Sequence, residues 1–331
     1  ACLGIVCTAS FYFIPQGEWL LAAILYAFAA VGFSGGNVFY DSLIVSVSNN
    51  ENRNRVSALG YSLGYLGGGL LFLVNVIMFL NPQFFGIENQ SNAILISFVM
   101  VAFWWAFFSI PILRNVSESD TQKEEPRFFK AILQSFNEVY QTLMEVRKYK
   151  NVAIFLLAYW FYMDGIDTIV RMATAYGSDI GLEASSMITA LILTQFVGFP
   201  STLIFGYFAD KISFKKIISI GILIYILISI FASRITTATE FYLMAVVVGL
   251  VMGGVQAVSR AYFSSIIPED KEAQFFGFYN LVGKSAVVAG PALLAWISMI
   301  FNTPRAGILG LLILFIPGLI LLWMVPTQKN S

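Results

Sequence analysis

The residue with the clearest chemical potential is an aspartate in the middle of a long apolar run. Asp164 comes thirteen residues after Asn151, where the run begins. In a helix this places it roughly 20 Å along the axis, near or past the midplane of a membrane. An ionisable group there costs about 2.5–3.5 kcal/mol on insertion, so it needs a reason to be present. We expect Asp164 to take up a proton or bind an ammonium group; the alternative is a carboxylate satisfied by neighbouring polar side chains. Gly165 beside it allows a close helix approach or a local break.

Two more charges follow in the same run. Asp167 and Arg171 are four residues apart and therefore share one helix face. The simpler interpretation is an internal ion pair between them. Alternatively, Arg171 presents its guanidinium to a substrate carboxylate, which together with Asp164 would suit a zwitterion.

The residue types that are missing narrow the chemistry further. The chain has no histidine, and its two cysteines, Cys2 and Cys7, lie in one apolar run without a disulfide or zinc pattern. The sequence has no cluster that combines a nucleophile, a general base or metal ligands, so we expect neither an enzyme nor a cofactor. No Walker phosphate loop is present, so ATP drive is not expected. The net charge of zero argues against a nucleic-acid binder.

The elements that must position these residues are membrane-spanning helices. Hydrophobic residues make up 58% of the chain and charged residues 11%, less than half of the roughly 25% typical of soluble domains. A helix needs about 20 apolar residues to cross a bilayer. We predict ten apolar segments, the first of them too short to span: Ala1–Ile14, Trp19–Val45, Val56–Leu80, Ala93–Leu113, Asn151–Thr174, Ala184–Phe208, Phe214–Ser233, Phe241–Ile267, Phe275–Ile300 and Ala306–Val325.

The loops between these segments carry an asymmetric distribution of basic residues. The side opposite the predicted cytoplasm holds only Arg234 and Arg305. The cytoplasmic side holds Arg53, Arg55, Arg114, Lys123, Arg127, Lys130, Arg147, Lys148, Lys150, Lys211, Lys215, Lys216, Lys271 and Lys329. This bias predicts that the long segment after Arg114 is cytoplasmic. Its second part, Arg127–Lys150, is amphipathic and is expected to be either a helix in the membrane interface that links two halves mechanically or a mere tether.

The two halves of the chain resemble each other at an offset of 218 residues. Gly35 and Gly36 match Gly253 and Gly254, and Tyr61 matches Tyr279. Both copies have the same orientation, as in transporters built from two parallel six-helix halves. The offset predicts that two helices and part of a third precede Ala1 in the complete protein.

The sequence around the loop after residue 205 resembles that of the major facilitator superfamily. The loop signature comprises a glycine, an aspartate and a basic cluster: Gly206, Asp210, Lys211, Lys215 and Lys216, with Ser213 where the pattern prefers glycine. The chain is more specifically similar to the vacuolar-effluxer-like branch, also called the "unknown major facilitator" family. The residues that carry this similarity are 40–69, 253–260 and 275–280, together with Asp164-Gly165. The glycine-rich stretch from Gly60 to Gly69 resembles an exporter signature, with Tyr65 in place of its proline, and favours export; simple helix packing is the alternative.

The resemblance implies a fold and a division of the chain. We expect an all-α polytopic membrane protein with the major facilitator fold of two parallel six-helix halves, the N-terminal two and a half helices missing. Residues 1–113 would be the remainder of the N-terminal bundle (helices 3–6), 114–150 the cytoplasmic linker, and 151–331 the C-terminal bundle (helices 7–12). The expected location is the bacterial inner membrane, or the vacuolar membrane in a fungus.

The resemblance also implies roles for polar residues near the cavity. Asp41 and Arg260 would lie near the cytoplasmic ends of symmetry-related helices and pair when that side closes; otherwise each binds local backbone or lipid phosphate. Asn37 and Gln256, deeper on the same helices, would hydrogen-bond the solute or pack between helices.

The predicted function is secondary active transport of a small polar solute by alternating access, as proton-coupled amino acid efflux. We expect a monomer whose partners are the solute, protons and the lipid bilayer. The alternative is a non-transporting receptor or interaction protein on a transporter scaffold.

Overall fold

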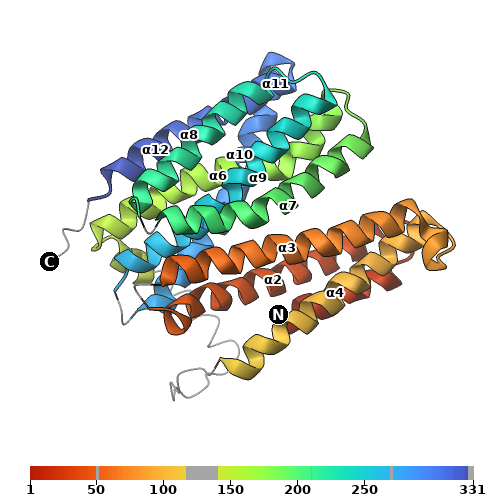
Figure 1. The fold of residues 1–331 in the computed structure, drawn as a ribbon, viewed down its shortest axis with the longest axis horizontal. Coiled ribbons are helices and arrows are strands. Elements are labelled where there is room, and N and C mark those ends of the chain that lie inside the picture. Colours follow the sequence, from red (N-terminus) through yellow and green to blue (C-terminus); the bar gives the residue numbers. More distant parts are fainter. Residues whose placement is uncertain (50–51, 117–140, 210, 269–270, 327–331) are drawn as a thin grey trace. The chain divides into compact units, whose positions relative to one another are not determined.

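The chain is all-helical in the regions that the structure describes. The computed structural model describes residues 1–49, 52–116, 141–209, 211–268 and 271–326. The first half contains α1 (Cys2–Ser10), η1 (Phe11–Phe13), α2 (Trp19–Val47), α3 (Arg53–Leu80), η2 (Pro82–Phe85) and α4 (Gln90–Asn115). The second contains α6 (Lys150–Asp179), α7 (Ala184–Ala209), α8 (Phe214–Ala232), α9 (Ala238–Ile266), α10 (Glu272–Phe301), α11 (Pro304–Gly310) and α12 (Leu312–Met324) (Figure 1).

Within these described residues, nine helical segments are long and apolar enough to cross a membrane. They correspond to the predicted spans, and their ends differ from the predicted ends by at most five residues. The last predicted span, Ala306–Val325, differs because a turn at Leu311 divides it into α11 and α12. Continuous hydropathy does not reveal such an interruption, since every residue around it is apolar.

The predicted repeat is visible in the helix boundaries. Shifted by 218 residues, α2 falls on 237–265 and α9 occupies Ala238–Ile266. Shifted in the same way, α3 falls on 271–298 and α10 occupies Glu272–Phe301. The repeat therefore extends beyond a few matching residues to the bounds of two helices in each half of the chain.

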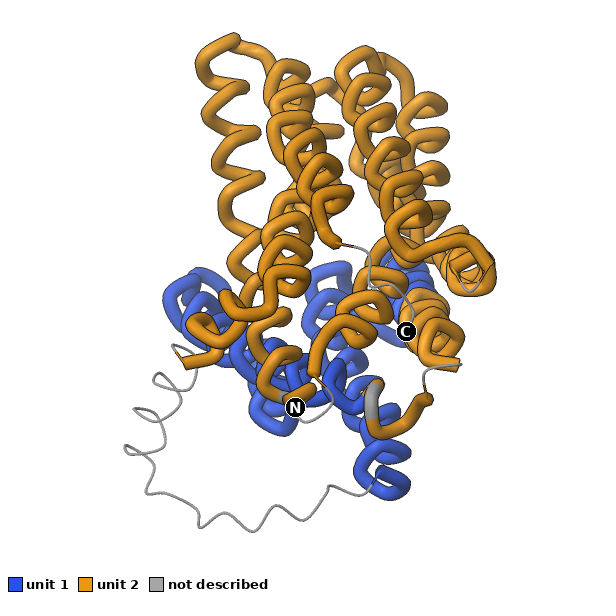
Figure 2. Tube along the Cα trace, turned by 90° about the vertical axis from the view of Figure 1, so that its left-hand side faces the viewer, with its two compact units in different colours: residues 1–43, 67–131 blue, residues 44–66, 132–331 orange. Residues whose placement is uncertain are grey.

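The described chain forms two compact units (Figure 2). Unit 1 consists of 1–43 and 67–131, and unit 2 of 44–66 and 132–331, so α3 is divided between them at Leu66. In unit 1, α1 approaches its neighbours closely. A Cβ on Gly4 would lie 2.3 Å from the Trp105 ring, and one on Gly32 would lie 2.3 Å from the Gly4 nitrogen. Only glycine allows these helices to pack so tightly.

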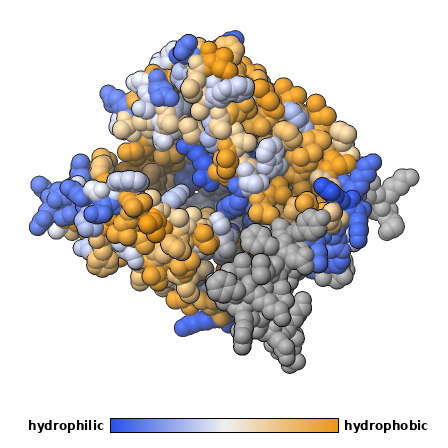
Figure 3. Space-filling view, turned by 180° about the vertical axis from the view of Figure 1, so that it is seen from behind, coloured by the Kyte–Doolittle hydropathy of each residue, from blue (hydrophilic) through white to orange (hydrophobic). Residues whose placement is uncertain are grey.

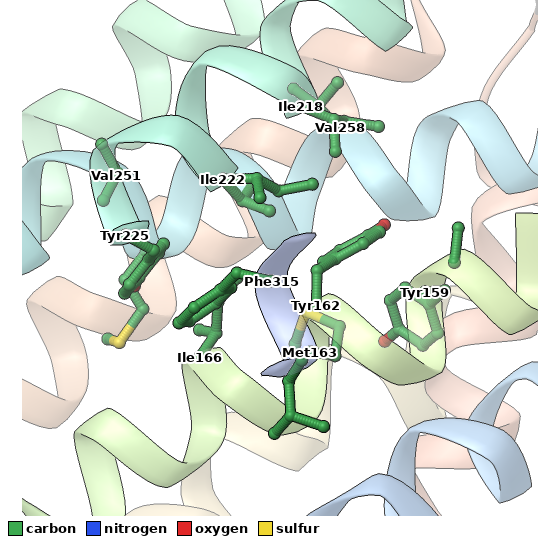
Figure 4. Close-up of a cluster of buried hydrophobic side chains, with 14 of the residues drawn as sticks. Tyr159, Tyr162, Met163, Ile166, Ile218, Ile222, Tyr225, Val251, Val258 and Phe315 are labelled. Carbon is green, nitrogen blue, oxygen red and sulfur yellow. The ribbon is translucent and has the colours of Figure 1, made fainter. Parts of the chain in front are cut away.

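The core of unit 2 is built around α6, which packs against α10, α12 and α9. Tyr162 and Ile166 on α6 are fully buried beside Phe315 of α12 and Tyr225 of α8 (Figure 4). The predicted consequence of Gly165 is partly confirmed. It allows close approach, because an added Cβ would lie 2.7 Å from the Phe315 ring, but α6 continues through it without a break.

Apolar side chains are also abundant on the outside. Phe39, Trp19 and Val288 are each more than 70% exposed, and orange apolar residues cover much of the face drawn in Figure 3. A helix that is apolar on its outer side as well as its inner side is typical of a membrane protein, because lipid replaces water there.

The predicted interfacial helix Arg127–Lys150 lies largely outside the described residues. Its described end, 141–146, is helical and contacts the start of α10. Glu145 forms an ion pair with Lys271, and Gln274 donates a hydrogen bond to Thr142 at 2.6 Å. This part of the linker is thus attached to the C-terminal helices.

Candidate functional site

The first half of α3 is bound to α7 and α9 by a row of polar contacts within unit 2, which we call the α3 seam. Arg53 donates to the Ser264 carbonyl at 3.2 Å, and Ser57 Oγ donates to the Ala257 carbonyl at 2.9 Å. Further along, Ser62 Oγ donates to the Phe199 carbonyl at 2.7 Å. Most of these acceptors are backbone carbonyls, so the α3 seam joins helices without relying on large apolar side chains.

Small residues bring the helices of the α3 seam together. A Cβ on Gly206 of α7 would lie 2.4 Å from the Ala58 Cβ, and one on Gly253 of α9 would lie 2.4 Å from the Tyr65 ring. The signature glycine, Gly206, therefore lies against α3 rather than merely in a turn. The sequence resemblance predicted its importance but not this partner.

Arg260 is the buried charge of the α3 seam. It is only 4% exposed and donates to Ser57 through Nε to Oγ at 3.0 Å and through Nη2 to the carbonyl at 3.2 Å. Its guanidinium also lies 4.7 Å from the centroid of the Tyr61 ring. The predicted partner, Asp41, belongs to α2 and to the other compact unit. The Asp41–Arg260 gate therefore stays a prediction, whereas Ser57 and Tyr61 are partners that sequence reasoning missed.

The two predicted neutral candidates have different surroundings. Gln256 lies in the α3 seam, where its Oε1 accepts a hydrogen bond from the Tyr65 hydroxyl at 3.1 Å. Asn37 is half-buried on α2 in unit 1. Their roles toward a solute stay predictions.

Asp164 lies between α6 and α10 and is fully buried. Its Oδ1 accepts a hydrogen bond from the backbone N–H of Gly290 at 2.9 Å, while its Oδ2 has no hydrogen-bond partner. The Thr168 hydroxyl, one turn along α6, is also buried; it lies outside strict hydrogen-bond geometry but close enough to act on the Asp164 carboxyl. The carboxyl is thus only partly satisfied, by a main-chain donor and by the nearby Thr168 hydroxyl, which also acts on it.

Asp167 and Arg171 do not form an ion pair in the described part of the chain. Asp167 is half-buried and Arg171 is exposed. The positive charges that act on Asp167 are those of Arg171 and Lys284, the latter on α10. Both cations therefore act on the Asp167 carboxylate from distances longer than that of a direct salt bridge.

The basic residues of the loop signature do not act as one cluster. Lys215 is 8% exposed, and its ammonium donates to the carbonyl of Val325 at the end of α12. This position is favourable for a cation, because a helix C-terminus carries partial negative charge. Lys211 lies over the Tyr207 ring at 4.2 Å, and Lys216 is exposed. Asp210 lies outside the described residues.

An aromatic block fills unit 2 next to the α3 seam. Tyr159 and Tyr279 stack with ring centroids 4.3 Å apart, and Phe263 stacks on Tyr279 at 4.7 Å. The Tyr162 and Ser259 hydroxyls are 2.7 Å apart and share a hydrogen bond. These residues come from α6, α9 and α10. The sequence indicated Tyr279 through the repeat, and it included Ser259 only within the family-like segment 253–260.

A small apolar cavity lies between α6, α7 and α9. Ile169 and Ala173 of α6 face it, together with Met187 and Leu191 of α7 and Met244 of α9. These α6 positions lie on the side of the helix away from Asp164, because residues five and nine positions on are rotated by roughly 140° and 180° at about 100° per residue.

The fold defines the class of protein. Two solved structures of the fucose:proton symporter FucP, one of the Escherichia coli protein and one titled as a major facilitator superfamily transporter in the outward conformation, match it with TM-scores of 0.66 and 0.65. They cover 98% of this chain and 83% and 80% of those chains at 10% identity, a likeness that concerns the fold alone. The chain thus has the predicted major facilitator fold and is an integral membrane protein.

Sequence similarity to known proteins also defines the family of this chain. The model of the family described as "Vacuole effluxer Atg22 like" matches residues 45–331, and the chain belongs to this family. It is 37% identical to the "Uncharacterized MFS-type transporter YxiO" of Bacillus subtilis over 99% of this chain and 76% of that protein. It is 24% identical to autophagy-related protein 22 of Yarrowia lipolytica, covering 91% of this chain but 55% of the fungal protein. The chain therefore spans about half of such fungal relatives. The Bacillus relative is described as a transporter, in agreement with the expectation that this chain is not an enzyme.

Proposed function

We propose that the complete protein is a secondary active transporter that exports amino acids by alternating access, driven by a proton gradient, and that it works as a monomer. The observation that carries this proposal is the α3 seam. Its polar contacts join the first half of α3 to α7 and α9 around a buried arginine, Arg260. A contact of this kind can close one end of a solute path and can also release it.

The strength of the α3 seam suits a reversible gate. At least six hydrogen bonds cross it among the described residues, from Arg53, Ser57, Ser62, Tyr65 and twice from Arg260. At about 0.5–1.5 kcal/mol each they contribute roughly 3–9 kcal/mol in total. Moving a two-state equilibrium from 1:99 to 99:1 takes about 5.5 kcal/mol, so differential binding of a solute and a proton can open and close such a gate.

The charges on α6 support an amino acid as the solute. Asp167 on α6 can interact with an ammonium group, and Arg171, one turn further, can interact with a carboxylate. Asn37 and Gln256 are the neutral groups that we propose to hydrogen-bond the solute. We propose that Asp41 pairs with Arg260 when the gate closes.

Transport in vesicles tests this function. The complete protein, reconstituted into proteoliposomes, should move a mixture of radiolabelled amino acids when a pH gradient is imposed, and a protonophore should abolish their accumulation. Empty vesicles are the control. If no amino acid moves with or without the gradient, the amino-acid assignment is wrong, and a non-transporting role on this scaffold gains support.

A further inference from the structure

The carboxyl group of Asp164 is the one buried acid of unit 2 whose hydrogen bonding is incomplete in the described part of the chain. The backbone N–H of Gly290 supplies a single donor to Oδ1. Oδ2 is buried without a hydrogen bond, and the Thr168 hydroxyl acts on the carboxyl only from outside strict hydrogen-bond geometry. Both side chains are no more than 1% exposed. A carboxylate left in this condition would be costly, because burial removes water and little replaces it.

Nearby charges do not remove that cost. The charge that acts on Asp164 is that of Asp167, which is also negative. Of the helices packed against α6, neither α12 nor α7 carries Asp, Glu, Lys or Arg in its described length. Lys284 of α10 acts on Asp167, and Glu272 lies at the distant start of that helix. The ionisable side chains of α9 and α11 are engaged elsewhere: Arg260 at Ser57, Arg305 at the Ile235 carbonyl and Glu240 in the capping box of α9.

A proton suits this position better than a metal cation. A metal ion needs several oxygen ligands, whereas only Asp164 Oδ2 and Thr168 Oγ1 lie here without a hydrogen bond of strict geometry. No group of three or more potential metal-ligating side chains occurs among the described residues. The Gly290 N–H points a positive dipole at the carboxyl, which would repel a cation on that side. A proton on Oδ2 neutralises the group and needs no other ligand.

We infer that Asp164 binds the coupling proton, and that this proton site lies on the α10 side of α6, apart from the apolar cavity on the side of α7 and α9. This inference rests on the proposed function, since it names the site of its proton coupling. Asp167 and Arg171, the charges proposed to bind the solute, lie on the same side of α6 as Asp164, about 60° and 20° around the helix from it at about 100° per residue. Protonation of Asp164 would therefore change the charge that the solute meets there.

Gly290 links the proton site to the movement of α10. A Cβ at this position would lie 2.0 Å from Thr168 Oγ1 and 2.7 Å from Asp164 Oδ1, so only glycine lets α10 reach the carboxyl. Pro291 follows it inside the helix and lacks an N–H, which makes this part of α10 a natural place for a bend. When α10 bends away, water reaches Asp164 and the proton leaves; when α10 returns, the carboxyl is protonated again.

Infrared spectroscopy of the purified complete protein tests the proton site without any transport. A protonated carboxyl has a C=O stretching band that disappears in alkaline buffer as the carboxylate forms. The wild type should show such a band, and Asp164→Asn should lack it. Asp179→Asn, which removes an exposed acid at the end of the same helix, should retain it. If D164N does not fold, Asp164→Ser serves instead, because it also removes the acid.

Transport assays separate this inference from the proposed function. D164N keeps Oδ1 and mimics the protonated acid, so it should retain exchange of labelled amino acids across the membrane. Its accumulation of amino acids driven by a pH gradient should fall at least about 10-fold below that of the wild type. Gradient-driven accumulation by D164N at the wild-type level, or a band that persists in D164N, would overturn the inference. A band that depends on Asp164 in a wild type that moves no amino acid would support the proton site and refute the solute assignment. Accumulation driven by sodium at equal pH and dependent on Asp164 would refute the proton.

Discussion

Replacing Arg260 with alanine is expected to reduce amino acid flux by about 100-fold. The side chain is buried, donates two hydrogen bonds to Ser57 and lies against the Tyr61 ring. Truncating one partner of a buried, charge-assisted contact costs about 2–5 kcal/mol, and each 1.4 kcal/mol corresponds to a factor of ten. We therefore expect the closed form of the α3 seam to be lost, and the thermal stability of the purified protein to fall with it.

Two variants make this prediction specific. Arg260→Lys keeps the charge but cannot bond the Ser57 hydroxyl and carbonyl together, so its flux should lie between those of the wild type and R260A. Arg234→Ala removes an exposed arginine from the turn before α9 and should leave flux and stability unchanged. Flux in R260A equal to that in R234A would mean that the buried guanidinium does not take part in gating.

Replacing Gly253 with alanine should destabilise the protein by about 2–3 kcal/mol, the upper part of the range for overpacking a tightly packed core. The new Cβ would lie 2.0 Å from the Thr202 hydroxyl and 2.4 Å from the Tyr65 ring. Thr202 is fixed by a hydrogen bond to the Gly198 carbonyl at 2.7 Å, so it cannot withdraw without cost. The α7–α9 contact and the α3 seam would both have to shift, which thermal unfolding in detergent would report as a lower Tm.

The repeat supplies a matched control. Gly35 occupies the position equivalent to Gly253 in the first half, yet no heavy atom lies within 4 Å of a Cβ added to it. Gly35→Ala should therefore be neutral or slightly stabilising, since alanine favours a helix by up to about 1 kcal/mol over glycine. An equal loss of stability in G35A and G253A would show that the close approach at Gly253 is not the cause.

The helices and their repetition could be predicted from the sequence because both depend on local patterns. Apolar length sets where a membrane helix begins and ends, and a constant offset is detectable without any structure. Asp164 could also be selected, since a charge in an apolar run is conspicuous.

The partners of these residues could not be predicted, because they are largely backbone atoms or common side chains. The Gly290 N–H donates a hydrogen bond to Asp164, but the only sequence feature at this position is a glycine before a proline. Ser57 accepts hydrogen bonds from Arg260, but its repeat-related position is Phe275. The offset of 218 residues therefore did not indicate that Ser57 is polar for a reason. Lys215 was assigned to a basic loop cluster, yet its ammonium binds the end of α12, a helix more than a hundred residues away along the chain.

Cross-linking α3 to α7 tests most directly whether the α3 seam must open for transport. Ser62 and Phe199 are joined across it by a hydrogen bond of 2.7 Å. Cysteines at these two positions, in a background with Cys2 and Cys7 replaced by serine, can be linked by a short, reducible bifunctional thiol reagent. Linked protein should transport at least about 10-fold more slowly, since the free energy of a covalent link exceeds what substrate binding can supply. Reduction should restore the flux, and the single-cysteine variants should not respond. Full flux through fully linked protein would contradict alternating access at this seam.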